Sequence, residues 1–288
     1  MDESDERDTK IMPEQLAAIT KELSERELGV EIGKNFSESI QPWLHSIAKS
    51  TAALMALVTR AQESWEEGIK LFAEAMQRTR DALKRVELLA ELGWTLPMHM
   101  SLPEFHALVM QDGLTVNRVD EWFQDHYTRD DGVEFNTLRN FLLSSNELTF
   151  WKPLVEQVFR AFDRGDYAIC VPSLLLVFEG SLARPSGIAF QNEKKRKGFF
   201  ERKINGAIAG SIHHYIWKSV GHFCDIVFET AVSDGREHPV LKRNLILHGK
   251  SDPSKWDQAD CLRLFQAIST VLSVSHEIPT PSTELSVG

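Results

Sequence analysis

The chain has 288 residues, 42% of them hydrophobic, which is enough apolar surface for one large or two medium domains with a real core. Its formal net charge of −10 argues against a general nucleic-acid coat, because phosphate contacts dominate that kind of binding, so any RNA contact has to be local. Three cysteines, none in a Cys-x-x-Cys pair, indicate reduced thiols and favour a cytoplasmic protein.

The N-terminal half is expected to be helical and to carry no chemistry of its own. Residues 1–10 are rich in Asp and Glu and predict a disordered acidic tail. Residues 11–147 follow as a helical N-terminal region, a candidate sensor, regulatory module or dimerisation arm. Its longest feature is the proline-free stretch 43–92, whose apolar stripe predicts one long amphipathic helix or two helices with a break near Gly68. Intramolecular packing and a coiled coil both fit this stripe, and its uncharged run is too short to cross a membrane.

Three shorter helices are expected next, at about 102–111, 116–127 and 134–144. The first begins with Ser101-Leu102-Pro103-Glu104, which resembles a capping box with proline in the first turn. Asp130-Asp131-Gly132 separates the other two. It is acidic, but it lacks the alternating oxygen ligands and the later glutamate of a calcium loop, so it predicts a plain turn.

Residues 148–278 are expected to form a second helical domain, followed by a disordered Pro/Ser/Thr-rich tail at 279–288. An amphipathic helix is predicted from Trp151 to Phe162. The next predicted helix, Tyr167 to Leu182, contains one acid, Glu179. This carboxylate either faces a functional site or lies on the surface, and the sequence leaves both alternatives open.

A basic segment at 194–203 contains six Lys and Arg residues against one acid, with two aromatics between them. Such a patch is a candidate RNA contact in an otherwise acidic protein, carried by Lys194, Lys195, Arg196 and Lys197. A charge run is also typical of a solvated helix face, so both interpretations stand.

A long helix is expected at about 204–232. It carries several potential metal ligands, but their spacing places no His-x-x-x-His or Cys-x-x-Cys pair on one face, so no metal and no cofactor are predicted. These residues are His213, His214, His222 and Cys224.

The most informative stretch is Arg243-Asn244-Leu245-Ile246-Leu247-His248-Gly249. Asn244 and His248 are four residues apart and share one helix face, whereas Arg243 lies about 140° from His248 and needs its length to reach round. Gly249 is the usual residue just past a helix end, which puts His248 in the last turn, where exposed carbonyls favour a protonated imidazole. Arginine binds phosphate through a planar fork of donors. An Arg and a titrating His can cleave a phosphodiester without metal when the substrate supplies a 2′-OH, which points to RNA.

The Arg-Asn-x-x-x-His pattern resembles the signature of the HEPN superfamily of metal-independent ribonucleases. Upstream, the run 166–172 followed by Phe178-Glu179-Gly180 is similar to the first core helix of bacterial HEPN proteins of the abortive-infection and Apea-type families. The resemblance covers roughly residues 149–276. It implies an endoribonuclease, plausibly a toxin or antiviral defence effector, whose products carry a 2′,3′-cyclic phosphate.

The resemblance also implies roles and partners. His248 would be the general acid or base, Arg243 would stabilise charge on the phosphoryl oxygens, and Asn244 would orient the histidine or the phosphate. Glu179 would orient Arg243. The expected assembly is a homodimer with a composite active site that also brings two Lys250 side chains together, with an antitoxin or regulatory partner and no membrane.

The alternatives are a non-catalytic, HEPN-like dimeric protein that binds RNA or nucleotide or acts as a scaffold, and a purely structural helical protein. A closing amphipathic helix is expected at about 257–275. No segment shows convincing strand alternation, so the predicted fold class is all-α, with a C-terminal helical bundle.

Overall fold

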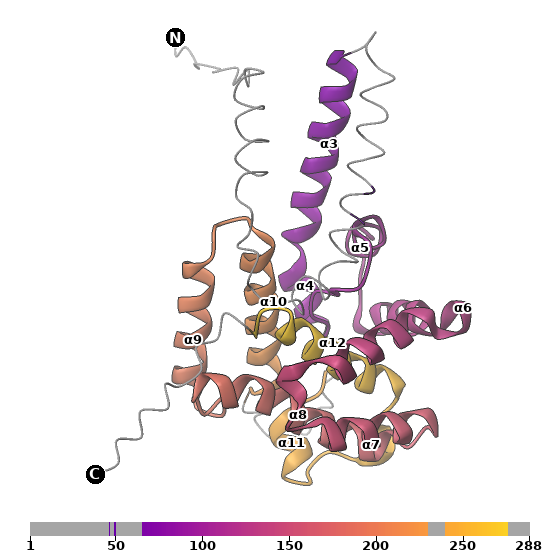
Figure 1. Cartoon of the computed structure of the whole chain (residues 1–288), viewed down its shortest axis with the longest axis vertical. Coiled ribbons are helices and arrows are strands. Elements are labelled where there is room, and N and C mark those ends of the chain that lie inside the picture. Colours follow the sequence, from indigo (N-terminus) through magenta and orange to yellow (C-terminus); the bar gives the residue numbers. More distant parts are fainter. Residues whose placement is uncertain (1–45, 47–48, 50–64, 230–239, 276–288) are drawn as a thin grey trace. The chain divides into compact units, whose positions relative to one another are not determined.

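The computed structural model describes residues 46, 49, 65–229 and 240–275, which lie in one unit of the chain, residues 39–288. All regular structure in these described residues is helical, so the predicted all-α class is confirmed for them (Figure 1). The two predicted tails, the first part of the proline-free stretch and the loop before the Arg-Asn-x-x-x-His motif lie outside the described residues.

Among the described elements, η1 and η2 are single turns of 3-10 helix and the others are α-helices. In chain order the elements are α3 (Trp65–Leu83), α4 (Val86–Glu91), α5 (Leu102–Val109), α6 (Val116–Ser144), η1 (Asn146–Leu148), α7 (Lys152–Asp163), α8 (Tyr167–Ser186), α9 (Glu193–Gly206), α10 (Ile212–Val227), α11 (Arg243–Leu247), η2 (Pro253–Lys255) and α12 (Gln258–Leu272).

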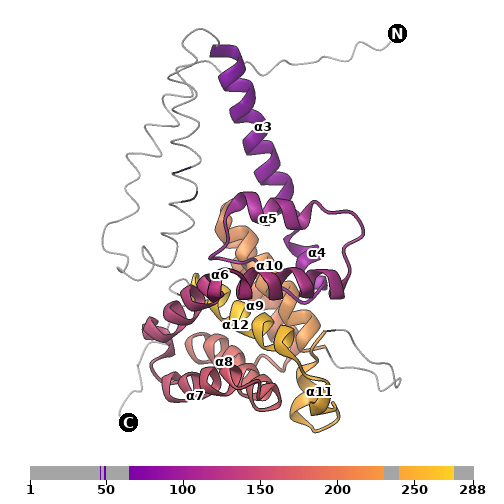
Figure 2. The same ribbon diagram turned by 90° about the vertical axis from the view of Figure 1, so that its right-hand side faces the viewer.

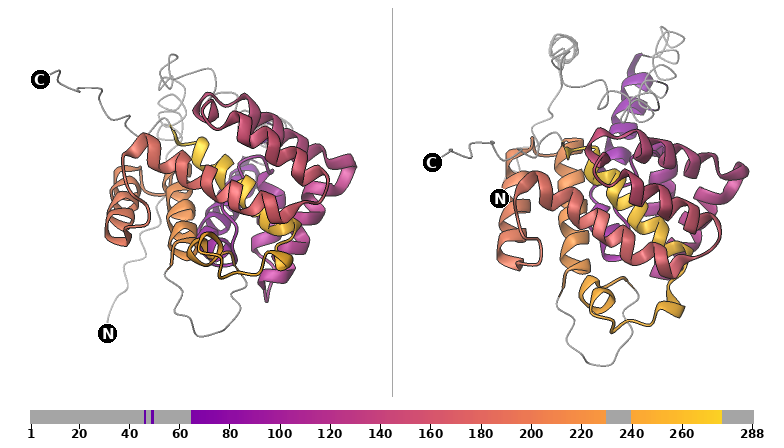
Figure 3. Two further views of the ribbon diagram at one scale, coloured as in Figure 1. Left: turned by 90° about the horizontal axis from the view of Figure 1, so that it is seen from below. Right: turned by 60° about the horizontal axis from the view of Figure 1, so that its bottom comes forward.

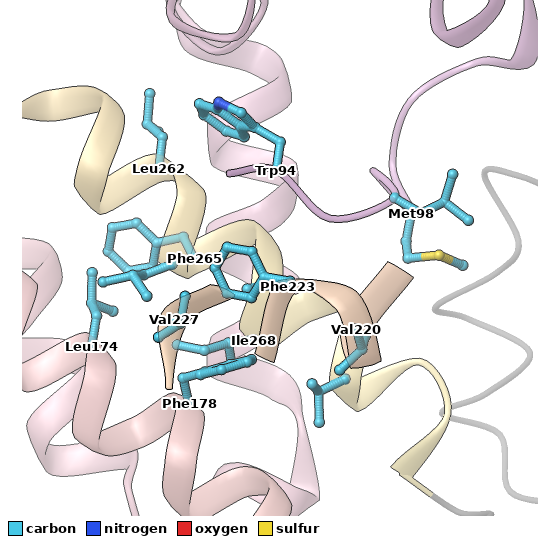
Figure 4. Packing of buried hydrophobic residues seen from close by; sticks show 14 of the residues in the cluster. Trp94, Met98, Leu174, Phe178, Val220, Phe223, Val227, Leu262, Phe265 and Ile268 are labelled. Atoms are coloured by element: carbon cyan, nitrogen blue, oxygen red, sulfur yellow. The ribbon is translucent and has the colours of Figure 1, made fainter. Parts of the chain in front are cut away.

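Helix α12 is the centre of the core. Every residue from Cys261 to Leu272 is buried, and the helix contacts α6, α8 and α10 (Figures 2 and 3). Phe265 stacks on Phe159 of α7 with ring centroids 4.5 Å apart. Figure 4 shows Phe265 among the core side chains of α8 and α10. A closing helix was expected here, but its polar side chains are buried too, so the expected exposed polar face is absent.

One hydrophobic cluster extends from Ala82 to Val274 through the described residues. Helices before and after residue 148 both contribute to it, and α12 packs on α6 as well as on α8. The boundary expected at residue 148 therefore falls inside a shared core.

The segment 93–100 crosses this core without regular structure. Its backbone is satisfied by side chains: the Ser219 hydroxyl accepts from the Leu96 N–H at 2.8 Å, and the Thr270 hydroxyl donates to the Leu96 carbonyl at 2.9 Å. Gln266 donates to the Thr95 carbonyl. The polar side chains buried on α10 and α12 are explained by this segment, because an unpaired buried backbone group is costly.

Several predicted helix ends are confirmed. Ser101 and Glu104 form the predicted capping box. The backbone leaves the helical region from Arg129 to Gly132, at the predicted turn inside α6, and Asp130 and Asp131 have φ values of 52° and 57°.

Of the two alternatives for the proline-free stretch, a break near Gly68 is excluded, because α3 runs through Gly68 and ends at Leu83. The continuous helix expected at about 204–232 is wrong within the described residues. The chain instead forms α9 and α10, separated by a turn in which Gly210 has a φ of 80° and Ser211 caps α10.

Helix α8 is long and apolar enough to cross a membrane by length and composition, and it is the one such helix among the described residues. Half of it is buried inside the protein, where Leu174 and Phe178 face the core (Figure 4). Leu182 on the same helix is also buried. It extends one turn further than predicted, to Ser186, and ends at Gly187 in the left-handed conformation.

Candidate functional site

The motif forms a single short helix, α11, at the surface. Ile246 is its buried anchor, and His248 is its C-cap. Gly249 follows with a φ of 65°, and the Lys250 N–H donates to the Leu245 carbonyl at 2.8 Å. The predicted helix end at His248-Gly249 is therefore confirmed, since the glycine supplies the left-handed residue that such an ending needs.

Arg243 is held against α8 by Glu179. Its Nε donates to Glu179 Oε2 at 3.0 Å, and its Nη1 donates to Asn244 Oδ1 at 3.3 Å. The Arg243 and Glu179 side chains are 16% and 11% exposed. Of the two alternatives for Glu179, the structure thus shows the contact with Arg243, and Glu179 is not a surface carboxylate.

Two contacts that could not be predicted from the sequence complete this arrangement. The Gln191 amide donates to Glu179 Oε1, so both carboxylate oxygens have a donor. Lys242 is buried, and its Nζ donates to Glu229 Oε2 at 2.6 Å and to the Ile226 carbonyl at 3.0 Å. Lys242 therefore connects the start of α11 to the end of α10. No local sequence pattern predicts this contact or the one between Gln191 and Glu179.

One amino group of the Arg243 guanidinium, Nη2, remains unpaired within the described residues. It is not one of their buried unpaired nitrogens. A guanidinium oriented through Nε by a carboxylate and open at Nη2 is suited to bind a phosphoryl oxygen.

His248 is exposed, and its imidazole forms no hydrogen bond or ion pair with any residue that the structure describes. Lys250 is also exposed. Asn244 uses its side-chain oxygen to accept from Arg243, and its backbone carbonyl accepts from the His248 N–H at 3.2 Å. Within the described part of the chain, neither the Arg243 nor the Asn244 side chain is hydrogen-bonded to the His248 imidazole. The five-residue spacing turns Arg243 about 140° from His248 around α11.

The basic segment folds as α9, and only part of it is available to a ligand. Arg196 is buried: its Nε donates to Asp225 Oδ1 at 3.2 Å, its Nη1 donates to the Phe190 carbonyl, and it lies over the Phe228 ring. The prediction that Arg196 contacts RNA is therefore wrong, because this side chain is committed to the core. Lys197 pairs with Glu193 at 2.6 Å, and Lys194 and Lys195 are exposed.

An open hollow of about 690 Å³ lies along α9. Its lining mixes both charges, so it offers no concentrated positive surface for an anion. The lining residues are Asn192, Glu193, Lys194, Lys197, Gly198 and Glu201.

The described residues contain no group of three or more His, Cys, Asp or Glu that could hold a metal ion. On α10, the His214 ring nitrogen lies 3.3 Å from the Ile204 carbonyl and His222 lies 3.4 Å from Glu91. Cys224 is buried, and this burial raises the pKa of its thiol. These side chains have separate partners and do not converge on one point.

The groups whose protonation is most perturbed lie away from α11. Burial lowers the pKa of His99 and of His126 to about 4 in both cases. Burial also raises the pKa of Asp260 to about 6, although Arg263 pairs with it. These groups lie in the core contacts of the segment 93–100, α6 and α12. Their pKa shifts therefore result from packing of the core and not from the candidate site.

No protein-family model, curated protein or solved structure matches this chain. The HEPN resemblance therefore rests on the motif residues and on the run 166–172 with Phe178-Glu179-Gly180.

Proposed function

We propose that the protein is a metal-independent endoribonuclease of the HEPN type. The observation that carries the proposal is the ion pair between Arg243 and Glu179, which joins the two separate segments on which the HEPN resemblance rests. The exposed His248 imidazole at the end of the same helix supplies an available proton-transfer group.

The proposed reaction needs no group other than these side chains and the substrate. The ribose 2′-OH attacks the adjacent phosphorus, its proton passes to a base, and the bond to the 5′-oxygen breaks as that oxygen gains a proton. His248 acts as general acid or base. Arg243, oriented by Glu179, donates to the phosphoryl oxygens as they gain charge, and Asn244 orients the phosphate or the histidine. The products are a 2′,3′-cyclic phosphate and a 5′-OH.

The active assembly is a homodimer with a composite cleft. Because Arg243 and His248 project about 140° apart on one copy, a second copy is the simplest source of the complementary group. Two Lys250 side chains would add positive charge to the cleft of a protein whose net charge is −10. A toxin or defence effector of this kind also needs an antitoxin or regulatory partner, and the region 11–147 is the candidate sensor.

The test is cleavage of total tRNA by the purified full chain in EDTA, with His248→Ala and Arg243→Gln alongside. We expect wild-type cleavage to persist in EDTA, with loss of about 100-fold or more in each variant. Arg160→Gln, an exposed cation on α7, serves as the matched charge control. Absence of wild-type cleavage, or equal cleavage by wild type and His248→Ala, rejects the ribonuclease. A monomer by size-exclusion with light scattering rejects the composite cleft.

The second candidate is a non-catalytic, HEPN-like dimeric protein that binds RNA or nucleotide or serves as a scaffold. The observation that favours it is the neutralisation of Arg243 by Glu179, which suits a stable interface contact as well as a catalytic one. RNA binding without cleavage in the same assay distinguishes it from the enzyme.

A further inference from the structure

Phe150 is an exposed aromatic residue stacked on an arginine. It lies between η1 and α7 and is 61% exposed. The Arg184 guanidinium carbon sits 3.9 Å from the centroid of its ring, and Trp151 meets the same ring edge-on with centroids 5.0 Å apart. A ring supported by a guanidinium and still largely open to solvent is a stacking surface.

The position of this ring is fixed by α8. Gly180 has no side chain, and a Cβ built there would approach the Trp151 indole more closely than real Cβ atoms do. Trp151 therefore lies directly on the α8 backbone, and its carbonyl accepts from the N–H groups of Leu154 and Val155 at 2.9 Å in the first turn of α7. The neighbouring Phe150 is thus presented from a rigid base.

Arg184, which stacks on Phe150, and Lys152, two residues after Phe150 in the chain, are both exposed. Neither forms an ion pair within the described part of the chain. Other arginines differ: Arg139 pairs with Asp163 and Arg164 pairs with Asp166. The donors of Arg184 and Lys152 therefore remain available to an anion.

We infer that Phe150, Arg184 and Lys152 form a subsite for single-stranded RNA, in which a base stacks on Phe150 and the two cations bind flanking phosphates. Base stacking on an exposed aromatic next to cations is how single strands are bound without sequence preference. A small anion would not need the exposed ring, and an apolar protein partner would leave two cations unpaired. The inference rests on the proposed function for the choice of RNA as ligand.

The subsite lies on the same helix as the partner of Arg243. Glu179 and Arg184 are five residues apart on α8, about 7.5 Å along the helix axis and about 140° around it. A helix with its side chains is roughly 10–12 Å in diameter. A strand a few nucleotides long that crosses the exposed face of α8 would reach both Phe150 and Arg243, so the subsite holds substrate beside the motif.

The experiment measures binding of a fluorescent oligouridine by anisotropy, in EDTA, in a His248→Ala background. We expect Phe150→Ala to weaken binding about 10-fold, Phe150→Trp to retain it, and Arg184→Gln and Lys152→Gln each to weaken it. Each charge variant should reduce the salt slope by about 0.7, the value for one lost phosphate contact on a single strand, whereas Phe150→Ala should leave the slope unchanged. Ile208→Ala, at a residue that is 74% exposed, and Arg160→Gln on α7 are the matched apolar and charge controls.

The outcomes separate this subsite from the ribonuclease proposal. Unchanged affinity in Phe150→Ala and Arg184→Gln, or equal losses in the two controls, overturns the subsite. A change in oligomeric state of Phe150→Ala with unchanged RNA affinity also overturns it, in favour of contact between copies. Wild-type binding with these losses but no cleavage supports the subsite and rejects the enzyme. No RNA binding by the wild type rejects both.

Discussion

Glu179 is the residue on which the orientation of the Arg243 side chain depends. Both of its oxygens are occupied, by Arg243 and by Gln191, in a site where little solvent reaches either charge. Removing one partner of such a pair leaves the other charge poorly solvated, which costs more than the pair contributes. The pair therefore serves to fix a donor in place more than to stabilise the fold.

We predict that Glu179→Gln lowers the free energy of unfolding by roughly 3 kcal/mol, near the lower end for a broken buried ion pair. The double variant Glu179→Gln/Arg243→Gln should lose less than the sum of the two single variants, because no unpaired charge remains. Urea unfolding of the four proteins measures this coupling. Glu121→Gln, an exposed acid on α6, is the control. Strict additivity would show that the two side chains do not interact.

His99 links protonation to stability. Its Nε2 lies 3.0 Å from the Ser269 hydroxyl, and its buried Nδ1 has no hydrogen-bond partner among the residues that the structure describes. Burial lowers the pKa of His99 from 6.5 to about 4. The unfolded chain therefore binds a proton near pH 6.5 that the folded chain does not bind until about pH 4. Stability from this residue is full above pH 6.5 and is lost as pH falls between these two values.

We predict that the free energy of unfolding of the wild type falls more steeply from pH 6.5 to 4 than that of His99→Gln, by up to about 3 kcal/mol over the window. Asp260 acts in the opposite direction between its ordinary pKa and about 6, because burial raises its pKa and the folded state holds the extra proton. Comparing urea titrations of the two proteins at fixed pH values cancels the Asp260 effect. Parallel curves would contradict the role given to His99.

At the scale of the elements, the contact between α8 and the start of α7 depends on a missing side chain. Gly180→Ala should lower the free energy of unfolding by about 1–3 kcal/mol, because the new methyl group overlaps the Trp151 ring. Gly198→Ala in α9 meets only an Arg202 nitrogen at 3.5 Å and should raise it by roughly 0.5–1 kcal/mol through helix propensity. Thermal and urea unfolding of both variants measures the contrast. Equal effects of the two would mean that the indole moves aside freely.

Helix ends could be predicted where a single residue decides them. Ser101 with Glu104, and Gly249 after His248, act through their own hydrogen bonds or φ value, so their signals are local. The division between α9 and α10 also has local signals, Gly210 and Ser211. Apolar residues occur on both sides of this turn, so the sequence resembled one continuous helix. Gly68 shows the converse, since a glycine inside a helix breaks nothing when the flanking residues favour the helix.

The candidate site was predictable in its residues and less so in its contacts. The motif marked Arg243 and His248, but the partner of Arg243 lies 64 positions away, where only the HEPN resemblance suggested it. Arg196 shows why composition misleads: among adjacent basic residues on one helix, a single side chain points inward and pairs with Asp225, and the charge run does not say which. Phe150 is exposed, and no hydrophobic periodicity in the sequence distinguishes it from a core residue.

At the scale of the whole molecule, side chains on α10 and α12 hold the segment 93–100. We predict that Ser219→Ala lowers the free energy of unfolding by about 1–3 kcal/mol, because the Leu96 N–H loses its acceptor in a site closed to water. Ser173→Ala, which removes a hydroxyl bonded to its own helix at Ile169, is the control and should change stability by less than about 0.5 kcal/mol. Urea unfolding compares them. A similar loss in both variants would argue against a specific role for the Leu96 contact.

The pairing of residues 95 and 96 with Thr270 spans 174 to 175 positions of the chain. During synthesis the segment 93–100 emerges from the ribosome long before α12 is made. Until then its backbone groups and the aromatic rings that pack around Phe265 lack their native contacts. Closing such distant contacts is slow, and the waiting chain exposes surface that chaperones bind or that aggregates. Folding of this core therefore waits until α12 has been synthesised, and a nascent chain stalled before α12 lacks the partners of residues 95 and 96.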